Sequence, residues 1–245
     1  MKFTAISRDS NEFFKLINYN LLINGFAVIN DFLGKDAYEF QQLKILYAKL
    51  IKEKEASFYE GGSCKVFKNI KNNLSENLDA LKIFYENKTI KKVSEYILGK
   101  NLNVDVFQTL DTVKSSHIAQ RPHFDRIPTL KFMLYMNDID TKNGSLFCSP
   151  GSHHWVKKQY PLPRPKFNNK EFFRKTREIP NFIVDNLIPL NGKEGQLIIF
   201  DTDVIHKQGL VENSTCKIFR AHYRNRRKYY TKDQNRLFFF TNFIR

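Results

Sequence analysis

The first hundred residues carry apolar positions at helical spacing. Apolar residues recur three and four apart over residues 11–24, 36–56 and 79–98, which places them on one face of a helix in each segment. On the second helix this face consists of Tyr38, Leu43, Leu46, Tyr47 and Leu50. Gly25 and Gly99 follow the first and third segments as helix stop signals, and the apolar run 26–29 predicts a short buried strand.

The pattern changes after Gly99. Apolar runs at 103–110, 130–136, 187–190, 196–200 and 217–223 are separated by Gly, Pro and Asn, which is typical of strands joined by turns. Asn143-Gly144 predicts a hairpin turn, since both residues tolerate positive φ. Many short strands with tight turns predict a mainly β fold with flanking α-helices, a sandwich or jelly roll.

Residues 155–182 interrupt the strand pattern with Pro161, Pro163 and Pro165 and with many basic residues. We expect an insertion over one end of the barrel, a loop with a short helix near 170–176. No repeat or linker is visible, so the chain is predicted to be one domain over residues 1–245. Its helical part is 1–99, and its β core is 100–236 with the insertion.

Composition excludes several classes of protein. With 42% hydrophobic residues in 245, the chain can bury a sizeable core, so wholesale disorder is excluded. The longest apolar runs are too short to span a membrane, and the first ten residues lack the apolar core of a signal peptide. Cys64, Cys148 and Cys216 are too scattered for a disulfide framework or a zinc cluster. A cytoplasmic protein is expected.

The charge is strongly positive. Forty Lys and Arg against 25 Asp and Glu give a formal net charge of +15, a field that attracts nucleic acid, phospholipid or phosphate-bearing small molecules. A Lys- and Asn-rich composition throughout the chain explains the charge equally well. Two groups are either solvated surface or phosphate contacts: Lys157, Lys158, Arg164, Lys166, Lys170, Arg174, Lys175 and Arg177 in the insertion, and Arg224, Arg226, Arg227 and Lys228 after the last strand.

The run Gln-Arg-Pro-His-Phe-Asp-Arg at 120–126 contains two candidate metal ligands. In extended chain, residues two apart point to the same side, so His123 and Asp125 present an imidazole and a carboxylate to one point. His206 is the best third ligand, because it follows the buried run 196–200 after a short polar turn. Two histidines and one carboxylate form the facial triad of non-haem Fe(II) oxygenases. Asp201 and Asp203, in that turn, are expected to cap it.

The order of these motifs resembles the phytanoyl-CoA dioxygenase family. The resemblance rests on residues 123–138, Asn143-Gly144, Pro-Gly-Ser-His at 150–153, the run 195–201, His206 and residues 219–223, with 24–32 as the N-terminal opening. It covers the chain from about residue 20 to 225. It implies a double-stranded β-helix (a cupin-like jelly roll) that binds Fe(II) and 2-oxoglutarate. Members use O2 to hydroxylate an unactivated C–H bond, and they release succinate and CO2.

The resemblance also assigns roles to residues. The implied metal ligands are His123, Asp125 and His206, and the retained carboxylate favours hydroxylation over halogenation. An Arg after the second His holds the distal carboxylate of 2-oxoglutarate. Strand alternation favours Arg220 over Lys217 for this role. Further cosubstrate contacts are expected from Gln108 or Thr109, on the strand before the His-x-Asp motif, and from Lys131 or Tyr135, on the strand after it.

Other functions remain open at this point. A non-catalytic jelly roll could bind an anionic ligand, and a metal-dependent cupin-like enzyme would not need Arg220. Arg220 and Arg226, six apart, faintly resemble nucleic-acid demethylases of the same superfamily, but Pro-Gly-Ser-His and Asn-Gly favour a small-molecule substrate, with phosphate as one option. His153 is expected to be structural, whereas His222 either lines the site or packs in the core.

Overall fold

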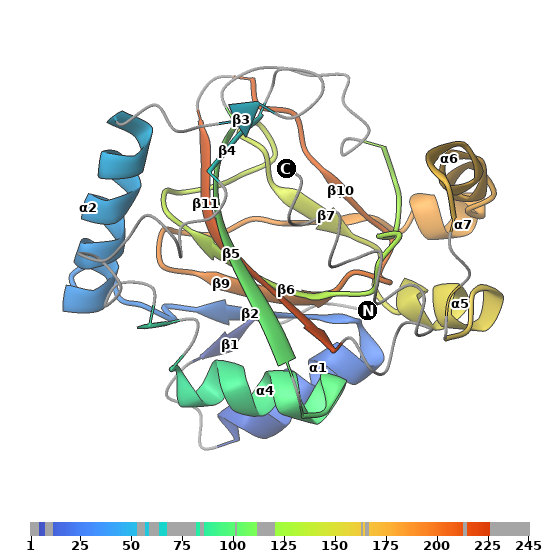
Figure 1. The fold of residues 1–245 in the computed structure, drawn as a ribbon, viewed down its shortest axis with the longest axis horizontal. Helices are drawn as coiled ribbons and strands as arrows, with labels where there is room; N and C mark the ends of the chain where they lie inside the picture. The colour runs from blue at the N-terminus through green and yellow to red at the C-terminus, as the bar shows by residue number, and fades with distance from the viewer. Residues whose placement is uncertain are drawn as a thin grey trace.

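The computed structural model describes residues 5–7, 12–52, 57–58, 64–67, 82–83, 86–100, 102–111, 121–162, 164, 167–212 and 215–225. Within them, the strands form two sheets (Figure 1). The larger has the order β1 (Ile6–Ser7), β2 (Phe26–Asn30), β9 (Leu197–Asp201), β6 (Leu130–Tyr135), β11 (Cys216–Asn225), β5 (Leu102–Asp111), β4 (Cys64–Phe67) and β3 (Ser57–Phe58). The smaller has the order β10 (His206–Gln208), β7 (Leu146–Cys148) and β8 (Ile188–Leu190). β1 and β2 pair in parallel, and the other pairs are antiparallel.

An apolar interior lies between the two sheets. Alternate residues of the central strands of the larger sheet, such as Val28, Met133, Ile198 and Ile218, pack with residues of β7 and β8. Tyr135 is fully buried there, and its hydroxyl donates a hydrogen bond of 2.8 Å to the Leu190 carbonyl, which ties the sheets together. The predicted β core therefore forms as two facing layers.

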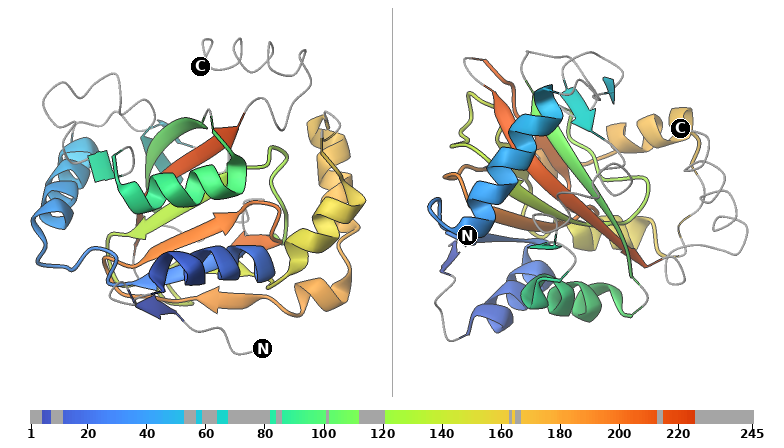
Figure 2. Two further views of the ribbon diagram at one scale, coloured as in Figure 1. Left: turned by 90° about the horizontal axis from the view of Figure 1, so that it is seen from below. Right: turned by 60° about the vertical axis from the view of Figure 1, so that its left-hand side comes forward.

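The other face of the larger sheet is covered by helices. α1 (Phe13–Ile23), α2 (Tyr38–Lys52) and α4 (Lys88–Leu98) pack against the intervening residues of β2, β6, β9 and β11 (Figure 2). All three were predicted, but α4 begins at Lys88 rather than at residue 79. The Asn87 side chain accepts hydrogen bonds from the backbone N–H groups of Thr89 and Ile90, which caps the helix there.

The predicted apolar face of α2 is partly wrong. Leu43, Leu46 and Tyr47 are buried as expected, but Tyr38 is 74% exposed and Phe40 is fully buried instead. Tyr38 is the first residue of the helix, before its apolar side meets the sheet. The Leu50 side chain lies outside the described part of the chain.

The hairpin predicted at Asn143-Gly144 is also wrong. β6, before it, pairs with β9 and β11, and β7, after it, pairs with β8 and β10. Gly144 does adopt φ 92°, while Asn143 has no positive φ and donates a side-chain hydrogen bond of 2.9 Å to the Asp138 carbonyl. The turn therefore moves the chain from one sheet to the other.

The insertion is more helical than predicted. α5 (Ser152–Gln159) leads into it, α6 (Asn169–Arg177) lies within it and α7 (Asn181–Val184) begins at its end, and the three helices gather at one side of the sheets in Figure 1. Only the helix near 170–176 was expected; α6 begins with a capping box between Asn168 and Glu171. None of the described helices combines the length and apolarity that a membrane crossing requires.

Candidate metal centre

Two segments far apart in sequence carry the three predicted ligands. His123 and Asp125 lie in the extended chain before β6, and His206 is the first residue of β10. The two segments are joined by backbone hydrogen bonds. His123 and His206 each donate to the other's carbonyl, at 2.9 and 2.8 Å, and Asp125 donates to the Thr202 carbonyl at 2.9 Å. Backbone pairing therefore sets the side chains next to one another.

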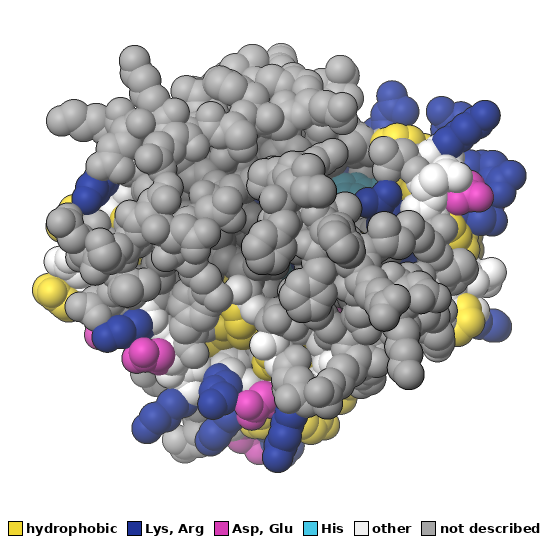
Figure 3. All heavy atoms as spheres, in the orientation of Figure 1, with side chains coloured by type: hydrophobic (Ala, Val, Ile, Leu, Met, Phe, Trp, Pro, Cys, Tyr) yellow, Lys and Arg dark blue, Asp and Glu magenta, His cyan; other side chains and the backbone are white. Residues whose placement is uncertain are grey.

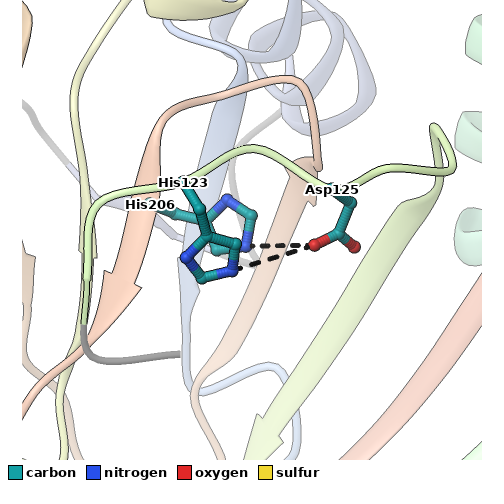
Figure 4. Close-up of side chains that lie close together, drawn as sticks. All are labelled: His123, Asp125 and His206. Atoms are coloured by element: carbon teal, nitrogen blue, oxygen red, sulfur yellow. Dashed lines mark ion pairs between the residues drawn. The ribbon is translucent and has the colours of Figure 1, made fainter. Parts of the chain in front are cut away.

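The three side chains converge (Figure 4). The Nε2 atoms of His206 and His123 lie 3.6 and 4.0 Å from Oδ1 of Asp125. The two imidazole rings are 4.4 Å apart at their centroids. One ligand atom from each residue lies within 4.8 Å of the others, the clustering that a metal ion requires.

Each histidine is oriented by its other nitrogen. Nδ1 of His123 lies 2.7 Å from the Arg121 carbonyl oxygen, and Nδ1 of His206 lies 2.7 Å from that of Val204. A carbonyl oxygen only accepts, so each Nδ1 carries the hydrogen and each Nε2 presents its lone pair to the centre. Burial, followed by the neighbouring His206, lowers the pKa of His123 to about 3, which keeps this ring neutral at physiological pH. These donors fit a divalent transition metal.

Asp125 is held by Lys131 from β6. The Lys131 ammonium lies 2.7 Å from Oδ2 of Asp125, which leaves Oδ1 for the two histidines. Burial alone would raise the pKa of Asp125, but Lys131 and the histidines outweigh it and hold that pKa well below its ordinary value. The carboxylate is therefore ionised, and its two oxygens have different neighbours.

Basic groups lie on the inner side of β11 near these ligands. Cys216 and Ile218 pack in the interior between the sheets, whereas Phe219 packs against the helices on the other face. Because side chains alternate along a strand, Arg220 and His222 lie on the same inner side as Ile218, toward the interior between the sheets. His222 pairs in register with Lys131. Burial, and then the charges of Lys131, Arg220 and Arg224, lower the pKa of His222 well below its ordinary value. A positive potential therefore surrounds the inner side of the centre.

The other predicted contacts have different surroundings. Tyr135 lies in the core between the sheets with its hydroxyl bonded to Leu190, which gives it a structural role. Gln108 and Thr109 stand opposite Phe219 and Ile218 on β5, and their side chains lie outside the described part.

The neighbouring polar residues are structural. Nε2 of buried His153 lies 3.1 Å from the Leu22 carbonyl oxygen, away from the three ligands, as expected. Asp201 caps its turn as predicted, because its Oδ1 accepts the Asp203 N–H at 3.0 Å. Residues 226–228, part of the second basic group, lie outside the described part.

Arg164 and Asp203 were assigned wrongly from the sequence. Arg164 was placed on a solvated or phosphate-binding surface, and Asp203 was expected to cap a turn. Their side chains form an ion pair of 2.9 Å and are 2% and 1% exposed. Arg164 Nη1 also donates to the Asp125 carbonyl at 3.2 Å. No local pattern distinguishes Arg164 from the other basic residues of the insertion, so only the structure identifies it.

Solved structures share this architecture. The epimerase SnoN, in complex with Fe3+, alpha ketoglutarate and nogalamycin RO, superposes with a TM-score of 0.68 at 15% identity, covering 86% of this chain and 83% of that one. HygX from Streptomyces hygroscopicus, with nickel and 2-oxoglutarate bound, gives 0.60 at 13% identity, covering 85% and 86%. A Pseudomonas putida prolyl-4-hydroxylase gives 0.59 at 14% identity, covering 87% and 99%. The predicted jelly roll with flanking helices is thereby confirmed.

The sequence comparisons give the family. A search of curated proteins returned no match. The family described as phytanoyl-CoA dioxygenase (PhyH) matches residues 23–219, a range that contains all three candidate ligands. Because this match spans well over half of the 245 residues, the chain belongs to the phytanoyl-CoA dioxygenase family.

Proposed function

We propose that the protein is an Fe(II)- and 2-oxoglutarate-dependent dioxygenase that hydroxylates an unactivated C–H bond of a small molecule, with release of succinate and CO2. The observation that carries this proposal is the convergence of His123, Asp125 and His206, with both Nδ1 atoms bonded to carbonyl oxygens. Two histidines and a carboxylate occupy one side of a metal and leave the other side to cosubstrate and O2. Bound there, Fe(II) would supply O2 activation coupled to decarboxylation of 2-oxoglutarate.

The chain's own residues have distinct parts in this function. His123, Asp125 and His206 bind the metal, and Lys131 fixes which oxygen of Asp125 faces it. Arg220 binds the distal carboxylate of 2-oxoglutarate, because a guanidinium offers two parallel donors to a carboxylate. Its place on the inner side of β11, where the charge of Lys131 also acts, supports this role over Lys217.

The proposed substrate is a small molecule, which includes anionic or carrier-linked compounds. The solved structure of SnoN is a complex with Fe3+, alpha ketoglutarate and the small molecule nogalamycin RO, and this similarity supports a small-molecule substrate. Figure 3 shows Lys and Arg side chains gathered where α6 lies, which favours an anionic substrate. The similar structures include an epimerase and a hydroxylase, so the mass of the product is the measurement that distinguishes hydroxylation from epimerisation. Hydroxylation adds one oxygen atom from O2, whereas epimerisation leaves the mass unchanged.

The proposal is tested by succinate formation from 2-oxoglutarate with Fe(II) under air, with and without candidate metabolites. Wild-type protein should form succinate, and His206→Ala and Asp125→Ala should not. His154→Ala is the matched control, since this histidine is exposed on α5 and outside the ligand group. Succinate formation by either ligand variant at the wild-type rate would refute the site.

A further inference from the structure

The insertion reaches the metal centre through one guanidinium. Nη1 of Arg164 lies 3.2 Å from the carbonyl oxygen of Asp125 and 2.9 Å from Oδ1 of Asp203. Asp125 belongs to the segment that also carries His123, and Asp203 belongs to the turn that leads into His206. Arg164 therefore contacts both ligand-bearing segments at once.

The insertion also buries the neighbours of the ligands. Phe124, between His123 and Asp125, is fully buried and stacks on Tyr160 at 5.2 Å. The Arg164 guanidinium lies 5.4 Å from the centre of the Phe124 ring. Ile205, directly before His206, packs in the same cluster with Val156 and Ile179 of the insertion and with Ile183 of α7. The back of each ligand segment thus rests on the core of α5 and α7.

We propose that Arg164, paired with Asp203, is a positioning residue that fixes the relative placement of Asp125 and His206 and so sets metal affinity. This inference rests on the proposed function, because it assumes that the three ligands bind a metal. It gives the insertion a part in building the centre, besides any contact with substrate.

The chemistry of the pair supports a positioning role. A buried ion pair contributes little net stability, because removing two charges from water offsets their attraction. Its geometric effect is larger, because a planar guanidinium has several donors in fixed directions, while a lysine ammonium is a point charge on a flexible stem. Arg164→Lys would keep the charge opposite Asp203 but lose the rigid bridge to the Asp125 carbonyl. Partners that orient metal ligands typically change affinity by about 10- to 100-fold when they are removed.

The test is titration with Co(II), read out by its ligand-field absorption, on folded protein checked by circular dichroism. Two variants are compared with wild type: the single variant Arg164→Lys, and a double variant, Arg164→Met with Asp203→Leu, which removes both charges. Lys158→Met is the matched control, a basic residue of the same insertion that is exposed on α5. We expect both Arg164 variants to weaken Co(II) binding at least tenfold and to alter its spectrum. The control should match wild type.

The outcomes separate the two proposals. If wild type binds Co(II) and Arg164→Lys has the same affinity and spectrum, the positioning role is overturned while the metal site stands. If wild type binds no Co(II), the proposed function fails and this inference fails with it. If the double variant does not fold, Arg164→Lys alone tests the positioning role, since this variant retains a cation opposite Asp203.

Discussion

Replacing Gly25 by alanine should destabilise the protein and weaken its metal site together. Gly25 joins α1 to β2 with φ 80°, and its carbonyl accepts the Asp201 N–H at 2.9 Å. A Cβ at this position would overlap Cγ2 of Val204 and lie 2.7 Å from Nδ1 of His153. Val204 belongs to the turn that ends at His206, and its carbonyl holds the Nδ1 of that ligand.

The expected size follows from two physical effects. A residue with a side chain in the left-handed region costs about 1–2 kcal/mol, and overpacking a buried contact costs about 1–3 kcal/mol. The free energy of unfolding should therefore fall by about 2–5 kcal/mol. For a chain of this size each kcal/mol lowers the melting temperature by about 2–4 °C, so Tm should fall by about 4–20 °C.

The assay is thermal unfolding followed by Co(II) titration well below the melting temperature. Gly34→Ala is the matched control, because a Cβ there meets no atom within 4 Å and the glycine has no positive φ. Gly25→Ala should lose both stability and Co(II) affinity, and Gly34→Ala should retain both. Equal melting temperatures for the two variants would refute the close approach of Gly25 to the turn. Lost stability with unchanged Co(II) affinity would refute its link to His206.

Two further results are expected. Arg220→Ala should raise the dissociation constant for 2-oxoglutarate by about 30-fold or more, because a charge pair that loses one partner costs about 2–5 kcal/mol. Lys217→Ala should change this dissociation constant little. A larger effect of Lys217→Ala would reverse the assignment of the carboxylate-binding residue. Burial, and then the charge of Lys157, lower the pKa of His153 to about 4, so the unfolded chain binds a proton between about pH 6.5 and pH 4 that the folded chain does not. Stability from this residue is therefore lost as pH falls through that window, by about 2 kcal/mol from pH 7.5 to pH 5. His153→Gln should flatten that part of the pH–stability curve measured by urea unfolding, and an unchanged slope would contradict the low pKa.

The periodicity of apolar residues predicted most of the secondary structure. The apolar spacing of residues 11–24 corresponds to α1, which buries one side against the larger sheet. The apolar runs at 130–136 and 196–200 correspond to β6 and β9, which are buried on both faces of that sheet. Strand pairing was less predictable. Asn143-Gly144 has the composition of a hairpin, but local composition does not say whether the next strand pairs with the last one or joins another sheet. β7 and β10 are three residues each, too short to give a periodic signal.

The candidate site was predictable where spacing fixes geometry. His123 and Asp125 are two apart in extended chain, and a buried strand leads into the turn before His206, so the structure brings all three together as expected. The partners of these residues were not predictable. Arg164 reaches Asp125 from 39 residues away along a basic insertion, and its burial depends on how that insertion packs on Phe124.

The most direct test of the central claim is an anaerobic titration with Fe(II) and then 2-oxoglutarate, followed by visible absorption. A metal-to-ligand charge-transfer band should appear only after both are present, because it requires 2-oxoglutarate to chelate the bound iron. The band should be lost in His206→Ala and should need more 2-oxoglutarate in Arg220→Ala. Fe(II) binding without such a band would point to a metal site that does not use 2-oxoglutarate. Absence of Fe(II) binding by the wild-type protein would contradict the assignment of His123, Asp125 and His206 as metal ligands.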